Sequence, residues 1–268
     1  STIALEHCTV TATGLDNVAG FKMGNCRQVT VQDVEFVGGR GGSQCDGSQH
    51  VRYVSCIAHD QVRGSSGDCW GFSVYDAPAP LFNGTIDVTY TDCSADNQQW
   101  HGFRAVGSAG GYTPTGVRWT NCVARSTTGN GEGFYIALAQ AQAVNCDAEG
   151  FGHGARIYTS TGCTLAGSRF AANAQDGIRF EGVGHSTSGG NYTGILLTDD
   201  SAQTGTTSVT ITGCRIGNLT TSNQNVGIWE TGPSTDYNSL HDCDCTGNKT
   251  CSSLTPAPHS RIVTDKAT

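Results

Sequence analysis

The sequence predicts an all-β fold in which short parallel strands wind into a right-handed β-helix, a solenoid of about nine coils with three strands in each. Three observations predict it: an eight-residue pattern that recurs nine times, a Gly-apolar pair that follows most copies, and a composition rich in glycine. Of the 268 residues, 37 are Gly and 6 are Pro, and only 14% are charged. This composition is typical of a β protein with many tight turns and unlike a helical bundle.

The eight-residue pattern reads apolar, any, apolar, any, turn-former, Cys, any, apolar. Hydrophobic residues alternate on both sides of a two-residue break, which predicts two short strands joined by a bend. The break holds residues suited to tight turns, such as Asp33, Asn121 and Gly213. The nine copies span residues 3–10, 29–36, 51–58, 88–95, 117–124, 141–148, 163–170, 209–216 and 238–245.

A third strand follows most copies and begins with Gly and an apolar residue. The Gly-apolar pairs start at Gly20, Gly71, Gly102, Gly133, Gly154, Gly177 and Gly227. Between Ser168 and Cys214 the spacing is longer, and this interval holds either a long loop or a degenerate coil around residues 195–202. We expect one domain over residues 1–268, with residues 246–268 as a C-terminal tail or cap.

Seven of the 13 cysteines occupy the same pattern position and are expected to form one inward-facing column of free thiols, because Cys packs well as a small buried hydrophobe. Cys45 and Cys69 differ. Each lies two residues before a glycine, in consecutive coils, so we expect them to be bonded or in contact. Cys245 and Cys251 form a second candidate disulfide.

Segments such as Val-Thr-Ile-Thr-Gly-Cys-Arg-Ile (209–216) and Asp-Gly-Ile-Arg-Phe (176–180) resemble the pectate-lyase-like superfamily of right-handed β-helices. The resemblance covers essentially the whole chain. Such proteins include pectate and alginate lyases, polygalacturonases, alginate epimerases, phage tailspikes and structural solenoids, so it implies a fold and not one activity. The paired-aspartate motif of polygalacturonases is absent, with Gly67-Asp68-Cys69 the nearest match, and so is the Asp-Pro-His motif of alginate epimerases.

The resemblance places a binding groove on the third strand, whose outward positions can be read from the alternation. Basic and aromatic residues stand there: Lys22, Arg104, Tyr135, Arg156, Arg179 and Trp229, with Tyr158 two positions further along. Arg forks bind carboxylates, so this stripe favours an acidic polysaccharide as partner. A second column immediately before the glycines holds the candidate catalytic residues His101, Glu132, His153 and Asp176.

Two reactions remain open at this stage. In a β-elimination, Tyr135, His101 or His153 would move the protons while Arg neutralises a uronate. In a hydrolysis, Glu132 and Asp176 would form a carboxylate pair two coils apart, at roughly 9.6 Å, near the upper limit for inversion. The alternative to an enzyme is a structural or adhesive solenoid of the tailspike or filament type.

The net charge of −8 argues against nucleic acid as a partner, and no apolar run is long enough to span a membrane. The sequence indicates no cofactor or metal, and a bound Ca²⁺ ion is compatible with the fold but not indicated. We expect an extracellular protein, or one on a cell or virion surface. Ser1 suggests a processed or excised chain, and the uncapped first coil suggests a homo-oligomer or a capping partner.

Overall fold

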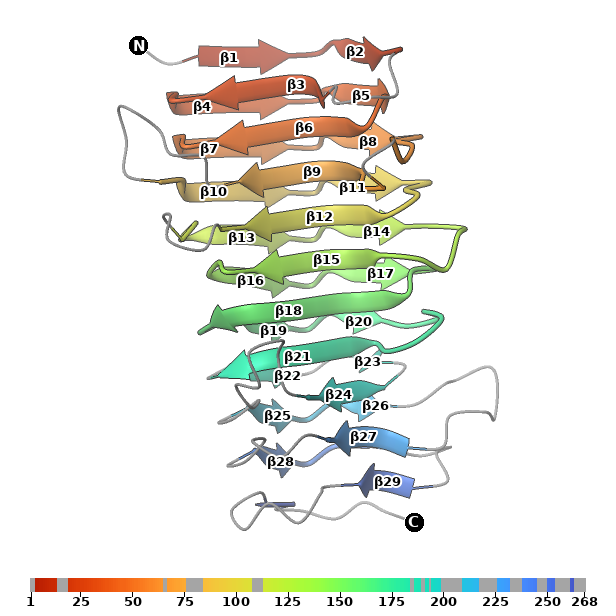
Figure 1. The fold of residues 1–268 in the computed structure, drawn as a ribbon. Helices are drawn as coiled ribbons and strands as arrows, with labels where there is room; N and C mark the ends of the chain where they lie inside the picture. Colours follow the sequence, from red (N-terminus) through yellow and green to blue (C-terminus); the bar gives the residue numbers. More distant parts are fainter. Residues whose placement is uncertain are drawn as a thin grey trace.

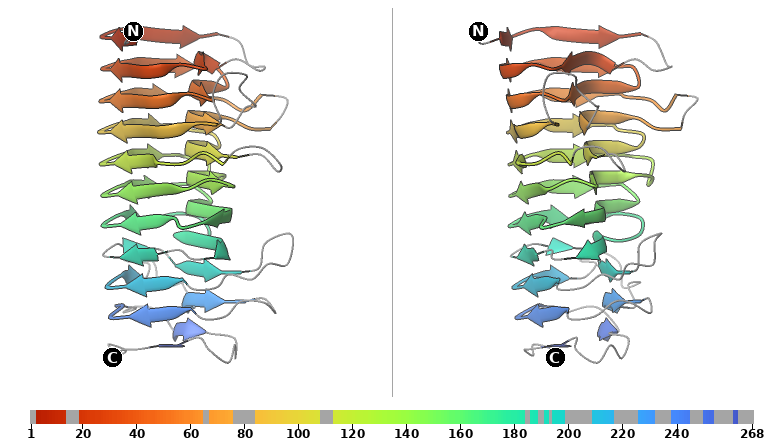
Figure 2. Two further views of the ribbon diagram at one scale, coloured as in Figure 1. Left: turned by 90° about the vertical axis from the view of Figure 1, so that its left-hand side faces the viewer. Right: turned by 60° about the vertical axis from the view of Figure 1, so that its left-hand side comes forward.

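A computed structural model describes residues 3–13, 19–64, 67–75, 84–107, 113–183, 186–188, 191–192, 194–198, 209–216, 226–231, 238–244, 250–253 and 261–262. Within these residues every strand pairing is parallel, and strands of successive coils stack into three sheets. The coils follow one another along a single axis, from β1 at the top of Figure 1 to β29 near the bottom (Figures 1 and 2). The predicted parallel β-helix is confirmed.

Sheets A and B are built from the two halves of the eight-residue pattern. Sheet A has eleven described strands, in the order β1 (Ile3–Glu6), β4 (Arg27–Gln32), β7 (Gln49–Val54), β10 (Ile86–Thr91), β13 (Val117–Thr120), β16 (Ala141–Val144), β19 (Thr164–Ala166), β22 (Ser186–Ser188), β25 (Thr210–Thr212), β28 (Ser239–His241) and β30 (Arg261–Ile262). Sheet B has nine, in the order β2 (Thr9–Ala12), β5 (Glu35–Gly38), β8 (Ile57–His59), β11 (Ser94–Asp96), β14 (Val123–Arg125), β17 (Asp147–Glu149), β20 (Arg169–Phe170), β23 (Asn191–Tyr192) and β26 (Arg215–Ile216).

Sheet C is built from the third strands. It has ten described strands, in the order β3 (Ala19–Gly24), β6 (Gly41–Asp46), β9 (Trp70–Tyr75), β12 (His101–Val106), β15 (Glu132–Ala137), β18 (His153–Thr161), β21 (Ile178–Val183), β24 (Ile195–Leu197), β27 (Val226–Glu230) and β29 (Thr250–Ser253). Between Ser168 and Cys214 the chain forms a full coil, β22, β23 and β24, which is the degenerate coil and not a long loop.

The bend between sheets A and B is the same in all nine copies of the pattern. Its residue has a positive φ each time, for example 52° at Asp33, 53° at Asn121 and 60° at Gly213. Asp, Asn and Gly tolerate this left-handed conformation better than other residues, which is why they recur there. The remaining six are His7, Ser55, Asp92, Asn145, Gly167 and Asp242.

Aromatic and thiol side chains stack along the axis inside the coils. The rings of Phe72, Phe103 and Phe134 are parallel to within 11°, with centroids 5.1 Å apart at each step. Each buried Phe contributes about 1.5–3 kcal/mol through removal of its surface from water. The predicted column of Cys56, Cys93, Cys122 and Cys146 is fully buried, as are Cys214 and Cys243, whereas Cys8 is partly exposed.

The expected contact between Cys45 and Cys69 is wrong. Both are buried free thiols, and Cys45 stands beside Met23 and Val74 in sheet C, while the Cys69 thiol donates to the Gln61 carbonyl at 3.7 Å. The expectation took the glycine after Cys45 as the start of the third strand, but β6 begins earlier, at Gly41. Cys245 lies outside the described residues, as does the side chain of Cys251, so their pairing stays a prediction.

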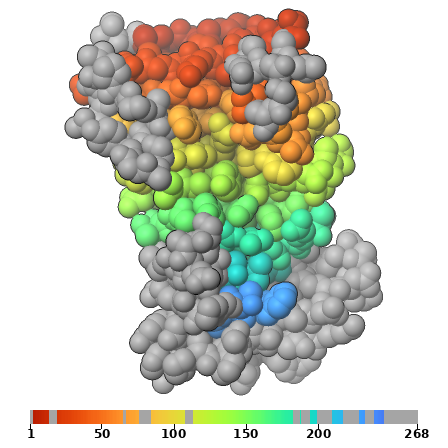
Figure 3. Space-filling view, viewed as in Figure 1, coloured from red at the N-terminus to blue at the C-terminus, as the bar shows by residue number. Residues whose placement is uncertain are grey.

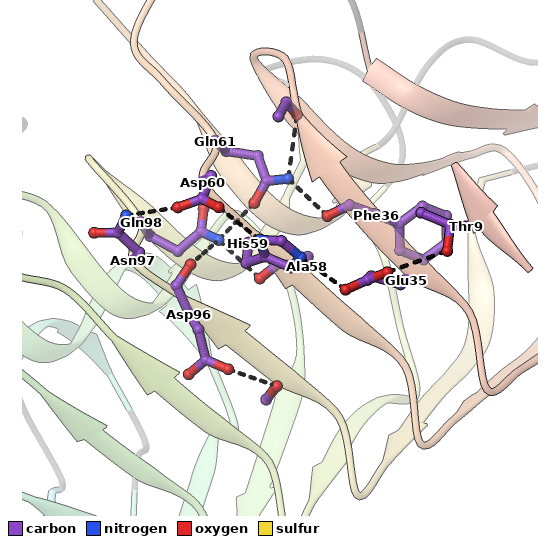
Figure 4. Close-up of polar contacts among 12 residues, drawn as sticks. Thr9, Glu35, Phe36, Ala58, His59, Asp60, Gln61, Asp96, Asn97 and Gln98 are labelled. Atoms are coloured by element: carbon purple, nitrogen blue, oxygen red, sulfur yellow. Dashed lines mark hydrogen bonds and ion pairs between the residues drawn. The ribbon is translucent and has the colours of Figure 1, made fainter. Parts of the chain in front are cut away.

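A polar ladder closes the corner that follows sheet B (Figure 4). The buried Gln61 side chain donates to the carbonyls of Phe36 and Gly38, both at 3.2 Å, and Gln98 donates to Oε1 of Gln61 at 2.6 Å. These bonds pair main-chain groups that the corner leaves without strand partners. Among the described residues, no helix is long and apolar enough to cross a membrane.

Candidate functional site

The outer face of sheet C carries one continuous row of side chains. Strand pairing aligns nine residues across successive coils: Lys22, Gln44, Ser73, Arg104, Tyr135, Arg156, Arg179, Leu196 and Trp229. Neighbouring strands lie ~4.8 Å apart, so the row runs parallel to the axis. Sheet C lies toward the viewer in Figure 1, and Figure 3 shows the same side of the molecule in space-filling form. Gln44 and Leu196 were not predicted, because the pattern missed the glycines of β6 and β24.

A second row lies where the strands of sheet C begin. Trp70, His101, Glu132 and His153 open β9, β12, β15 and β18, and Asp176 precedes β21. All except Asp176 are at most 7% exposed, so the corner of the helix covers them. A third row, two residues beyond the first, includes Tyr75, Tyr158 and Glu181. The predicted candidate residues of β9 to β21 are therefore brought together on one face.

Arg104 is aligned as expected, but the expectation that it is solvent-accessible is wrong. Its side chain is 11% exposed, Nη1 donates to Oδ2 of Asp68 at 2.6 Å, and Nε donates to Oγ of Ser73 at 2.8 Å. Its Cζ atom lies 3.8 Å from the Trp70 ring centroid, a cation–π contact. Burial lowers the pKa of Arg104, and the charge of Asp68 opposes this shift.

Asp68 belongs to this site, although the sequence did not predict it as a site residue. It lies in the turn before β9 and contacts three cationic or basic groups: Arg104, Arg40 with Nη2 at 3.6 Å, and His101 with Nε2 at 3.4 Å. A turn residue has no fixed place in the period-two pattern, which is why its direction could not be predicted.

His101 and Glu132 form the most buried charged contact of the site. Nδ1 of His101 lies 2.8 Å from Oε2 of Glu132, and Nη1 of Arg156 lies 3.5 Å from Oε1. Burial raises the pKa of Glu132, but the contact with His101 and the charges of His101, Arg156 and His153 outweigh it and hold that pKa below its ordinary value. Both ring nitrogens of His101 face carboxylates, which leaves this ring poorly placed as a proton carrier.

His153 has a different environment. Its Nδ1 lies 3.2 Å from Oδ2 of Asp176, and within the described part of the chain Nε2 has no hydrogen-bond or ion-pair partner. The two groups are within ion-pair distance, although Nδ1 makes no hydrogen bond to a described residue. We call this pair the His153–Asp176 dyad.

Tyr135 lies between the two histidine-containing strands. Its ring stacks on that of His101, with centroids 4.9 Å apart and an interplanar angle of 4°. The guanidinium of Arg156 lies 6.0 Å from the Tyr135 ring and 5.2 Å from that of Tyr158. Burial raises the pKa of Tyr135 above its ordinary value, although Arg156 opposes the shift. The phenol is consequently a proton donor near neutral pH.

Arg156 and Arg179 converge on Glu181, which is 2% exposed. Nη2 of Arg156 lies 3.2 Å from Oε2, and Nε of Arg179 contacts Oε1. The face is thus a network of alternating charges and not a free basic stripe. Trp229 is 53% exposed at the C-terminal end of the row. Within the described residues, no group of three or more His, Cys, Asp or Glu could hold a metal ion.

A pocket of about 570 Å³ opens at the N-terminal end of this face. Its walls come from β3, β6, β9 and β12 and from the turns before β6 and β9. The lining residues are Ala19, Lys22, Arg40, Gln44, Asp68, Trp70, Tyr75 and Arg104.

Comparison with known proteins gives a structural likeness and no closer one. No family model matches the sequence, and no curated protein matches it. The A-module of a mannuronan C-5 epimerase from Azotobacter vinelandii superposes with a TM-score of 0.62 and 19% identity, covering 89% of this chain and 65% of that one. The catalytic domain of a GH87 α-1,3-glucanase gives 0.63 and 12%, covering 97% and 54%.

Tailspike protein 3 of bacteriophage CBA120 gives a TM-score of 0.55 and 13% identity, covering 99% of this chain and 52% of that one. The chain therefore spans about half to two thirds of the length of these proteins. At such identities the likeness shows the fold alone, a right-handed parallel β-helix.

Proposed function

We propose that the outer face of sheet C binds an acidic polysaccharide, and that Tyr135 and His153 cleave it by β-elimination. The observation that carries the proposal is the position of Tyr135, in line with Arg104 and Arg156 and one strand from the His153–Asp176 dyad. A row along the axis suits an extended polymer. The epimerase and glucanase of the same fold are named for polysaccharide substrates, which supports this substrate class. We place the protein outside the cell or on a surface, where such polymers occur.

His153 acts as the base in this proposal. We assign the proton of the neutral ring to Nδ1, which lies 3.2 Å from Oδ2 of Asp176, so the lone pair on Nε2 takes the proton from the carbon next to the uronate carboxylate. The electron pair of that C–H bond forms a new carbon–carbon double bond. Asp176 stabilises the imidazolium that results, as a carboxylate does for a catalytic histidine elsewhere.

Tyr135 acts as the acid. As the double bond forms, the bond between the neighbouring carbon and the glycosidic oxygen breaks, and the phenol of Tyr135 donates its proton to that oxygen. The raised pKa of Tyr135 keeps this proton in place until the reaction. The products are a shortened polymer with a free hydroxyl and an unsaturated uronate, with no water consumed.

Arg156 neutralises the uronate carboxylate. Its side chain is 28% exposed, and its contacts with Glu132 and Glu181, at 3.5 Å and 3.2 Å, are longer than the 2.6 Å contact of Arg104 with Asp68. A substrate carboxylate can therefore share the Arg156 guanidinium, whereas Arg104 is already bound. Neutralisation makes the neighbouring C–H bond more acidic, and Arg156 and His153 both belong to β18.

Hydrolysis by Glu132 and Asp176 is less well supported. An inverting hydrolase needs one protonated carboxyl group to donate to the leaving oxygen. The pKa of Glu132 is held below its ordinary value by His101 and Arg156, so this carboxyl group is not protonated near neutral pH and cannot be that donor.

The product distinguishes these readings. Wild-type protein is incubated with pectate, with alginate and with a neutral glucan, and unsaturated-uronate absorbance and new reducing ends are followed together. We expect both signals to rise in step on one uronate polymer and neither on the glucan. Reducing ends without absorbance would establish hydrolysis instead, and neither signal on any polymer would leave the binding or structural solenoid as the better account.

A further inference from the structure

The pocket at the N-terminal end of sheet C is separate from the proposed reaction centre. Its lining residues Gln44 and Lys22 lie three and four strands from Tyr135 in the same row, or roughly 14 and 19 Å at the usual strand spacing. Its volume of about 570 Å³ is within the range of small-molecule sites. A polymer lying along the row reaches both places only if it extends over several sugar units.

Positive charge exceeds negative charge around this pocket. Among the residues that the structure describes, Lys22, Arg40 and Arg104 line it, against the carboxylate of Asp68. Asp46 lies behind Lys22, with Oδ2 at 2.8 Å from Nζ, and it is 6% exposed. Three cations therefore face two carboxylates, which favours an anionic group as the occupant.

The cationic groups are held in place before any ligand arrives. Ser73, Asp68 and the Trp70 ring each fix the guanidinium of Arg104, and the Cζ atom of Arg40 lies 5.0 Å from the centroid of the same ring. Trp70 is 5% exposed, so its ring supports the two guanidiniums and is not a platform for a sugar. Preorganised Arg groups lose little entropy when they bind a carboxylate.

Lys22 is the accessible member of the set. Its side chain is 60% exposed, and its ammonium group can donate to a ligand while it keeps the contact with Asp46. The amide nitrogen of Gln44 is held by both oxygens of Asp46, at 2.8 and 3.0 Å, which leaves its carbonyl oxygen to accept from a hydroxyl group.

We infer that this pocket is a subsite for a carboxylate-bearing sugar unit, bound by Lys22 beside the paired guanidiniums of Arg40 and Arg104, three to four coils from the bond that is cleaved. This inference rests on the proposed function, which supplies the acidic polysaccharide. It adds the place on sheet C where a second carboxylate of that polysaccharide is bound. Short fragments that cannot span from Tyr135 to Gln44 should then bind weakly, because they lack this contact.

The test measures binding without turnover. Isothermal titration compares a uronate tetramer with the same tetramer after reduction of its carboxyl groups, on the wild type, Lys22→Glu and Arg118→Glu. Arg118 is exposed on sheet A, so Arg118→Glu changes the net charge equally on another face. We expect Lys22→Glu to weaken uronate binding by at least about fivefold and Arg118→Glu by less than about twofold. Reduced tetramer should show no difference between the variants.

The two proposals fail separately. If Lys22→Glu and Arg118→Glu bind the uronate tetramer equally while wild-type protein releases unsaturated products, the subsite is refuted and the lyase function stands. If Lys22→Glu alone weakens binding and no product forms, the subsite stands and the reaction is refuted. A further titration is carried out with sulfate added. If sulfate weakens the binding of the uronate tetramer equally in Lys22→Glu and Arg118→Glu, a local carboxylate site is likewise refuted, because such a result indicates bulk screening only.

Discussion

Nδ1 of His101 lies 2.8 Å from Oε2 of Glu132 on the adjacent strand, and neither side chain is more than 7% exposed. This contact joins two groups of charges on sheet C. On one side Asp68 connects His101 to Arg104 and Arg40, and on the other Glu132 connects it to Arg156. His101 therefore connects the charged residues of the pocket with those of the proposed reaction centre.

Replacing Glu132 tests this link. Glu132→Gln removes the buried carboxylate that lies between His101 and Arg156 and leaves Arg156 only Glu181, and we expect the free energy of unfolding to fall by about 3 kcal/mol. Glu149→Gln is the matched control, since the Glu149 side chain is 37% exposed and pairs with Arg125 on sheet B, where a loss below about 1 kcal/mol is expected. Urea denaturation measures the free energy of unfolding of both variants. Equal losses would show that the buried contacts of Glu132 stabilise the fold no more than an exposed ion pair does.

The second prediction concerns pH and the cluster of His59, Asp60 and Glu35 on sheet B (Figure 4). Nδ1 of His59 lies 2.7 Å from Asp60 and Nε2 lies 3.0 Å from Glu35. The hydrogen bond to Asp60, with a smaller contribution from Glu35, raises the pKa of His59. The hydrogen bond from Asn97, followed by that from His59, lowers the pKa of Asp60.

A raised histidine pKa stabilises the fold below the unfolded value of about 6.5, and this contribution is lost as the pH rises through the folded value. A lowered Asp pKa stabilises it above about 3.9, with loss as the pH falls through the folded value. The cluster should therefore contribute most between about pH 4 and 6.5. Urea midpoints of wild type and His59→Gln should differ most near pH 5 and converge above about pH 8, and a larger difference at pH 9 would contradict this assignment.

The third prediction concerns the thiols. Eleven cysteines are free in the described residues, and burial raises the pKa of Cys45 to about 12 and of Cys69 and Cys163 to about 11. Thiol titration in denaturant should therefore find at least eleven reactive groups, while the native protein should react slowly near neutral pH, since thiolates are the reactive form. Nine or fewer groups in denaturant would mean that disulfides join residues described here as free.

The fourth prediction concerns the bend between sheets A and B. Asn121 has a φ of 53°, and its side chain donates to Asp92 at 3.1 Å. Asn121→Val places a β-branched residue in the left-handed region and should reduce the free energy of unfolding by about 1–2 kcal/mol. Asn121→Gly loses the side-chain bond but relieves the backbone, so it should cost less. A Val variant as stable as the Gly variant would argue against this bend geometry.

The fold could be predicted because each strand pair repeats a local rule. Alternation places Val31, Tyr53 and Trp119 inside, and the residue at the break allows the turn. Each copy of the pattern alone predicts little, but nine copies in the same phase predict one repeated coil. The coil containing β6 was missed at its third strand, because Gly41 and Gly42 are followed by Ser43 instead of an apolar residue. Thr187, in the degenerate coil, likewise stands where the pattern has an apolar residue.

The site could be predicted only in part. Period two correctly placed Arg104, Tyr135 and Arg156 on one outward row, because strand pairing alone decides that order. It could not show that their charges are already paired. Asp68 reaches Arg104 from a turn, and Glu132 lies at a corner, where side-chain direction depends on local torsion angles and not on the alternation.

The most direct test of the proposed chemistry is the rate of unsaturated product formation by His153→Gln on the uronate polymer that the wild type cleaves. His153→Gln removes the base but keeps a polar side chain beside Asp176, so kcat should fall by about 10²–10⁴-fold while KM changes little. His50→Gln, at a 57% exposed histidine side chain on sheet A, should retain the wild-type kcat. A kcat for His153→Gln within a factor of two of the wild-type value would contradict the account.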